Sequence, residues 1–94
     1  MEITGGLAVM QQLFEQANLV FDYVLKNKTN SDFKRAFGAD AAKLFSHAEH
    51  GREMVKKEDT TRTRSALINV ENVTARAPHS DFKETILNKI QEVA

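Results

Sequence analysis

Two histidines and a glutamate recur at every third position near the middle of the chain, in the segment SHAEHGRE that begins at Ser46. Imidazole nitrogens and carboxylate oxygens are ligands that zinc takes in proteins, so His47, His50 and Glu53 are candidate metal ligands. Zinc-binding helices more typically place their histidines one position further apart, and the remaining ligand would have to come from His79 or from a partner chain. A helical metal-binding protein is therefore one alternative, and a solvated histidine pair is the simpler interpretation.

A second candidate site is a run of basic side chains, which comprises Arg52, Lys56, Lys57, Arg62 and Arg64. Such a cluster predicts contact with phosphates and would suit a nucleic-acid-associated regulatory protein. Acidic residues at positions 53, 58 and 59 interrupt the run, and a mixed run of this kind is usually a solvated helix face. Nucleic-acid binding is therefore the weaker alternative, and it predicts an affinity that falls steeply with salt.

The sequence contains no constellation that predicts catalysis. Ser46 and His47 are adjacent, and adjacent side chains on a helix point in different directions, so a nucleophile and its base are not aligned there. Gly5 and Gly6 lack the Lys-Ser or Lys-Thr pair that a phosphate-binding loop requires. We expect a non-enzymatic protein without a cofactor.

Length and charge narrow the possible partners. The chain has 94 residues and no cysteine, so we expect a single helical domain over residues 1–94 whose core is thin and has no disulfide to brace it. A thin core without a disulfide favours an oligomer, because association would bury further apolar surface. The 13 basic and 13 acidic side chains cancel, which removes any overall electrostatic attraction to nucleic acid or to lipid.

The start of the chain does not resemble a targeting signal. Glu2 stands where a secretory signal needs positive charge, and Glu15 and Asp22 interrupt the first apolar segment. No run approaches the roughly 20 apolar residues that span a bilayer. We expect a small soluble cytoplasmic protein that does not bind a membrane.

Helical periodicity predicts an all-α protein, a small helical bundle of about three to four helices built on a long antiparallel helix hairpin over residues 6–57. Its first helix covers residues 6–27, and Ser31 is the expected N-cap of the second. Gly38 predicts a bend in the second helix. Gly51 predicts either the close approach of another backbone or a local weak point.

The remaining third of the chain predicts a connector and short C-terminal helices. Residues 58–65 lack an apolar face and are the expected connector. Residues 66–77 match both a helix and a strand, and we favour a helix because a lone strand would have no partner within this chain. Pro78 ends that element, and Ser80 is the expected cap of a last helix over residues 80–93.

The first helix is apolar on more of its circumference than one packing face needs. One stripe is expected to pack within the hairpin and comprises Met10, Phe14, Ala17, Phe21 and Val24. A second stripe, formed by Val9, Leu13 and Val20, is the candidate protein interface, and the alternative is that the helices after Ser65 cover it. These features predict a protein-interaction module that binds a protein partner or itself, as a homodimer or another homo-oligomer. An inhibitor or adaptor of the phage or mobile-element type is one hypothesis within that class.

Overall fold

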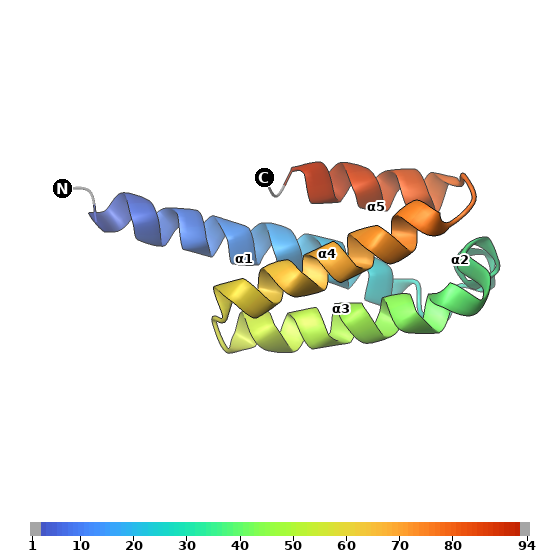
Figure 1. Ribbon diagram of the computed structural model, residues 1–94, viewed down its shortest axis with the longest axis horizontal. Coiled ribbons are helices and arrows are strands. Elements are labelled where there is room, and N and C mark those ends of the chain that lie inside the picture. The colour runs from blue at the N-terminus through green and yellow to red at the C-terminus, as the bar shows by residue number, and fades with distance from the viewer. Residues whose placement is uncertain (1–2, 93–94) are drawn as a thin grey trace.

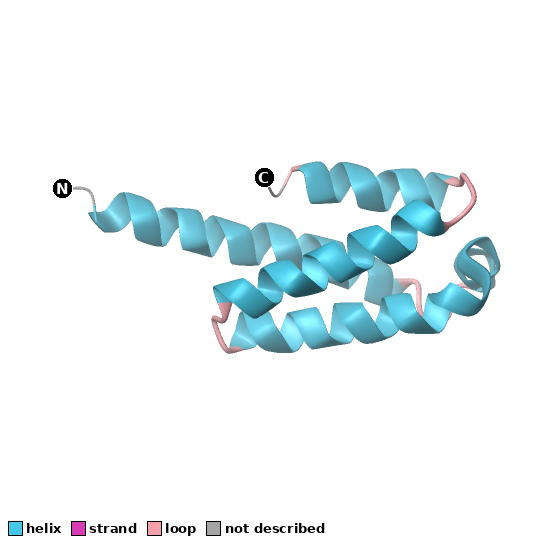
Figure 2. Ribbon diagram, viewed as in Figure 1, coloured by secondary structure: helices cyan, strands magenta, loops and turns pink. Residues whose placement is uncertain are grey.

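The computed structural model describes the backbone of residues 3–92 and the side chains of residues 9–92. Within these residues the chain forms helices and no strand, so the prediction of an all-α bundle is confirmed (Figures 1 and 2). The α-helices are α1 (Ile3–Lys26), α2 (Ser31–Phe37), α3 (Ala41–Lys56), α4 (Thr60–Arg76) and α5 (Asp81–Gln91), and the 3-10 helix η1 (Gly38–Asp40) joins α2 to α3. None of the described helices has the length and apolarity that crossing a bilayer requires.

The predicted hairpin is formed by α1 and α3, which run antiparallel, with α2 in the connection between them (Figure 1). The expected bend at Gly38 is instead a break in the helix. Gly38 has a φ of 61° and a ψ of −136°, a backbone conformation that is open to glycine and strained for other residues. The N-cap of α2 is also one residue earlier than expected, because the Asn30 side chain accepts hydrogen bonds from the N–H groups of Asp32 and Phe33.

Most of the predicted connector is the beginning of α4. Glu58, with a φ of 56°, ends the preceding helical segment. The Asp59 carboxylate then accepts a hydrogen bond from the Arg62 N–H at 2.9 Å and caps α4. A local cap therefore starts the helix at Thr60, before its first apolar residue. The helix predicted over residues 66–77 is the rest of α4, which ends at Arg76, ahead of Pro78.

The last helix follows its predicted cap. The Ser80 hydroxyl accepts a hydrogen bond from the Lys83 N–H at 3.1 Å, and α5 extends to Gln91. Val93, in the predicted range 80–93, lies outside the described residues. The Lys83 ammonium donates to the carbonyl oxygens of Ala75 and Ala77 at 3.1 and 2.7 Å, which joins the start of α5 to the end of α4.

The core forms where α3 packs against both α1 and α4, and where α5 packs against α1 and α4. Gly51 of α3 is buried against α1, and a Cβ atom built on it would overlap the Phe21 ring. Gly51 therefore permits a close approach, but the group that approaches is the Phe21 ring and not, as predicted, another backbone. The absent side chain leaves room for the ring between the two helices.

Helix lengths leave one end of α1 uncovered. At 1.5 Å per residue, the 24 residues of α1 extend about 36 Å, whereas the 11 residues of α5 extend only about 17 Å. The N-terminal part of α1 therefore projects past the rest of the bundle, while Leu13 still packs in the core (Figure 1). The overall extents are 49 × 22 × 18 Å, consistent with this projection. We refer to residues 3–14 as the free end of α1.

We predict that Gly51→Ala destabilises the fold by about 1 to 3 kcal/mol, because the added methyl group would overlap a Phe21 ring that is itself fully buried. Urea denaturation monitored by circular dichroism measures this change. Ser46→Ala, at an exposed position of the same helix, is the matched control and should change the free energy of unfolding by no more than about 0.5 kcal/mol. A Gly51→Ala variant as stable as its parent would contradict the close contact.

Candidate functional site

The three candidate metal ligands lie on α3 and do not converge. Each step of three residues turns an α-helix by about 300°, so successive members of the triplet drift around the helix axis. His47 is half-buried, whereas His50 and Glu53 are exposed. Glu53 also lies beside the Lys56 ammonium, at 3.6 Å. Within the part of the chain that the structure describes, no group of three or more histidine, cysteine, aspartate and glutamate residues is placed to hold a metal ion.

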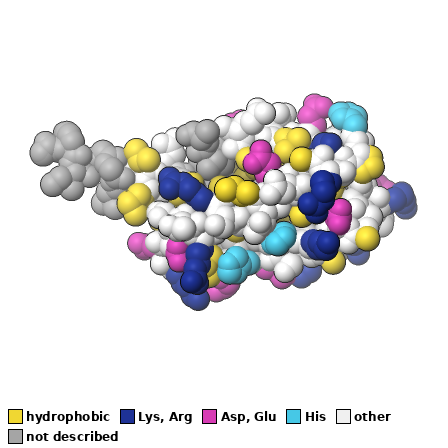
Figure 3. Space-filling model, in the orientation of Figure 1, with side chains coloured by type: hydrophobic (Ala, Val, Ile, Leu, Met, Phe, Trp, Pro, Cys, Tyr) yellow, Lys and Arg dark blue, Asp and Glu magenta, His cyan; other side chains and the backbone are white. Residues whose placement is uncertain are grey.

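The basic run between positions 52 and 64 is largely paired with carboxylates. Arg52 Nε lies 3.2 Å from Asp22 Oδ1 on α1. Lys56 and Arg62 each form an ion pair with the acidic residue three positions earlier, at 3.6 and 3.7 Å. Acidic and basic side chains are also interspersed over the face shown in Figure 3. Pairing lowers the local positive potential, so this geometry does not favour the nucleic-acid alternative.

The structure separates the side chains that were expected to face a partner. Val9 is 61% exposed, Leu13 is 7% exposed and Val20 is fully buried. Val20 belongs to the core because α1 packs against α4 and α5 as well as against α3. In this monomer Val20 is therefore not available to a partner, and Val9 is the member of the predicted interface that remains at the surface.

The stripe expected to pack within the hairpin also divides along its length. Ala17, Phe21 and Val24 are buried as expected. Met10 is 43% exposed and Phe14 is half-buried. Both stripes are therefore core near the middle of α1, and both become accessible toward its free end. The surplus apolar surface lies at that end of the helix and not along one side of it.

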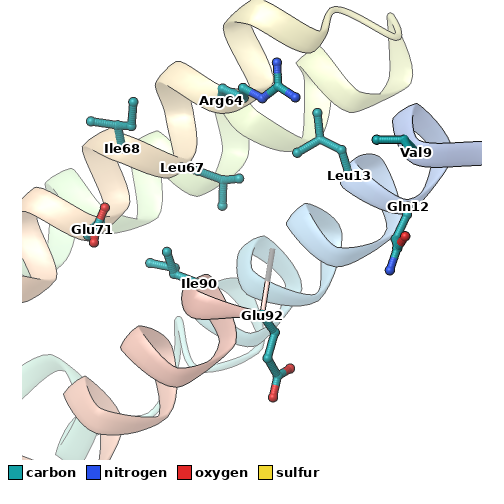
Figure 4. Close-up of a pocket in the computed structure, with 9 residues that line it drawn as sticks. All are labelled: Val9, Gln12, Leu13, Arg64, Leu67, Ile68, Glu71, Ile90 and Glu92. Atoms are coloured by element: carbon teal, nitrogen blue, oxygen red, sulfur yellow. The ribbon is translucent and has the colours of Figure 1, made fainter. Parts of the chain in front are cut away.

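One groove opens between the free end of α1, the outer side of α4 and the end of α5 (Figure 4). Its volume is about 510 Å³, and its apolar lining consists of Val9, Leu13, Leu67, Ile68 and Ile90. Its polar lining consists of Gln12, Arg64, Glu71 and Glu92. We call it the α4-side groove. The lining thus combines apolar side chains with polar groups of both signs.

A second groove lies between α1 and the end of α3. Its volume is about 410 Å³, and it is lined by Met10, Gln11, Phe14, Glu15, Val55 and Glu58. We call it the α3-side groove. The free end of α1 therefore contributes side chains to two grooves, Val9 and Leu13 to one and Met10 and Phe14 to the other. A partner that covered this end of the helix would bury apolar atoms in both.

Sequence reasoning did not assign to a site the apolar groove residues that α3, α4 and α5 contribute, which are Val55, Leu67, Ile68 and Ile90. Local patterns do not show which separate helices meet at one opening. One signal was available for Ile68. Ile68 does not share the helix face of the buried residues Leu67 and Val70, and it is 54% exposed. Its position outside the apolar stripe of α4 places it on the surface of the bundle.

The hydroxyl of Thr63 was also missed. Thr63 is fully buried on α4, and among the described residues its Oγ1 has no hydrogen-bond partner. A nucleophile needs access and an adjacent base, and a fully buried hydroxyl without a partner has neither. The polar atom instead carries a desolvation cost, since a buried group that loses water without gaining a hydrogen bond is destabilising.

Thr63→Val is therefore predicted to stabilise the protein by about 1 kcal/mol, because a methyl group of similar volume replaces the buried hydroxyl. Thermal and urea denaturation both measure the change. Thr61→Val makes the same replacement at an exposed position of the same helix and is the matched control. Destabilisation by Thr63→Val relative to Thr61→Val would show that the hydroxyl is hydrogen-bonded in solution.

Comparison of the chain with protein-family models, with curated proteins and with solved structures finds no match.

Proposed function

We propose that this chain is a non-enzymatic protein-interaction module that binds a second polypeptide through the free end of α1. One observation carries the proposal. Among residues 9–92, four large apolar side chains are exposed, and three of them, Val9, Met10 and Ile68, line the two grooves at this end of the bundle. The fourth, Leu19, lies further along α1 and lines neither groove.

Clustering distinguishes this surface from ordinary exposed apolar residues. Single exposed hydrophobic side chains are normal on soluble proteins, whereas a contiguous group beside a groove marks an interaction site. Burial of apolar surface contributes roughly 25 cal/mol per Å², so covering these side chains would favour association. The glutamines and carboxylates around both grooves supply the polar rim that protein interfaces commonly have.

The proposal is tested by photocross-linking in cells that produce the chain. Benzoylphenylalanine in place of Met10 should form covalent adducts with a second polypeptide several-fold more often than the same group in place of Leu19. Both positions are exposed on the same helix, but only Met10 lines a groove. Adding Val9→Asp to the Met10 probe should reduce the adduct, because a carboxylate at this position would have to lose water on binding.

Folding is checked independently for each variant. Val9 is 61% exposed, so Val9→Asp should leave the helical circular dichroism and the melting temperature nearly unchanged. Equal adduct yields from the probes at positions 10 and 19, or no adduct from position 10, would overturn the proposed function.

A further inference from the structure

We infer that the partner of the α4-side groove is a second copy of this chain, bound by antiparallel pairing of the two α4 helices around a two-fold axis near Ile68. This inference rests on the proposed function and names its partner. The evidence is the arrangement of charge along the outer face of α4.

Three exposed side chains form that outer face where α4 borders the groove. Arg64, Ile68 and Glu71 lie four and three positions apart, which places them on one side of the helix. The apolar member is in the middle, and it is flanked by a cation toward the start of α4 and by an anion toward its end. The ion pairs found among the described residues do not include Arg64 or Glu71.

This charge order is complementary to itself when the direction of the helix is reversed. In an antiparallel pair centred near Ile68, Arg64 of each copy lies opposite Glu71 of the other, so that one contact contains two ion pairs. In a parallel pair, each charge would instead lie opposite its own equivalent and be repelled. A two-fold contact uses the same patch on both copies, so the patch must be complementary to itself. A row with a cation at one end and an anion at the other is complementary to itself when one copy is reversed.

The rim also argues against a partner of one charge sign. Arg64 would repel a cationic partner, and Glu71 and Glu92 would repel an anionic one, including a nucleic-acid backbone. A partner surface that places an anion opposite Arg64 and a cation opposite Glu71 would be complementary to this rim. The outer face of α4 in a second, antiparallel copy is such a surface.

The free end of α1 enlarges the contact. Standard interfaces bury about 800 Å² on each partner, more than one pair of short helix faces supplies. On the opposite wall of the groove, Val9 is 61% exposed beside the buried Leu13, so the second copy would also cover Val9. We therefore expect concentration-dependent association, which weakens as salt screens the rim charges.

The test is sedimentation velocity on the full chain and on charge-reversed variants over a range of concentrations. The parent should form dimers. Arg64→Glu and Glu71→Arg alone should each raise the dimer dissociation constant by roughly tenfold or more, because each places two like-charge pairs in the interface. A mixture of the two single variants should form heterodimers, since both contacts then join opposite charges. The double variant should dimerise like the parent.

Other results would overturn the inference. A parent that stays monomeric, single variants that associate as well as the parent, or a mixture that remains monomeric would each exclude this dimer.

The proposed function and the proposed dimer can fail separately. If the parent is monomeric but the photoprobe at position 10 forms adducts with a different protein, the self-pairing is wrong and the proposed function stands. If neither dimers nor adducts form, both are wrong. Each variant alters an exposed side chain, and its melting temperature shows whether it is folded.

Discussion

The contact between the Phe21 ring and the backbone at Gly51 sets how α1 and α3 pack, and the other helices are built on that pair. A side chain at position 51 would occupy the space that the Phe21 ring fills. Because Gly51 has no Cβ atom, this face of α3 can pack closely against α1. α4 then packs on α3, and α5 packs against α1 and α4. With three helices against it, α1 is the central member of the bundle along its C-terminal half. This is why Val20 is fully buried and not held open for a partner.

The same arrangement explains why the other half of α1 is different. α5 is too short to follow α1 along its whole length, and the free end projects where its neighbours stop. Apolar side chains that would be core further along the helix are there exposed to water, beside grooves lined by Ile68, Ile90 and Val55. An uncovered helix end of this kind costs free energy in the isolated chain, and association with a second polypeptide would offset that cost. The architecture thus connects a difference in helix length to a candidate binding surface.

Two predictions that rest on local chemistry agree with the structure, whereas the cap expected at Ser31 is formed by Asn30. Ser80 caps α5 and Pro78 follows the end of α4, because caps and proline constraints act within a few residues. The start of α4 was missed because the Asp59 cap begins the helix although its first turn has no apolar residue.

The predicted interface residues Val9, Leu13 and Val20 share one helix face, as periodicity indicates. Periodicity does not reveal how many neighbours cover that face or where along the helix they stop. The break at Gly38 depends on a backbone conformation that a glycine permits but does not dictate.

Hydrogen exchange measured at several protein concentrations tests the central claim most directly, because it reports on the backbone of the free end without any substitution. If a second copy covers this end, raising the concentration should slow exchange at residues 9–14 of α1 and at residues 64–71 of α4. Residues 27–30, in the connection between α1 and α2 and remote from the proposed contact, should exchange at a constant rate. Exchange that is independent of concentration at 9–14 and at 64–71 would contradict self-association through the free end of α1.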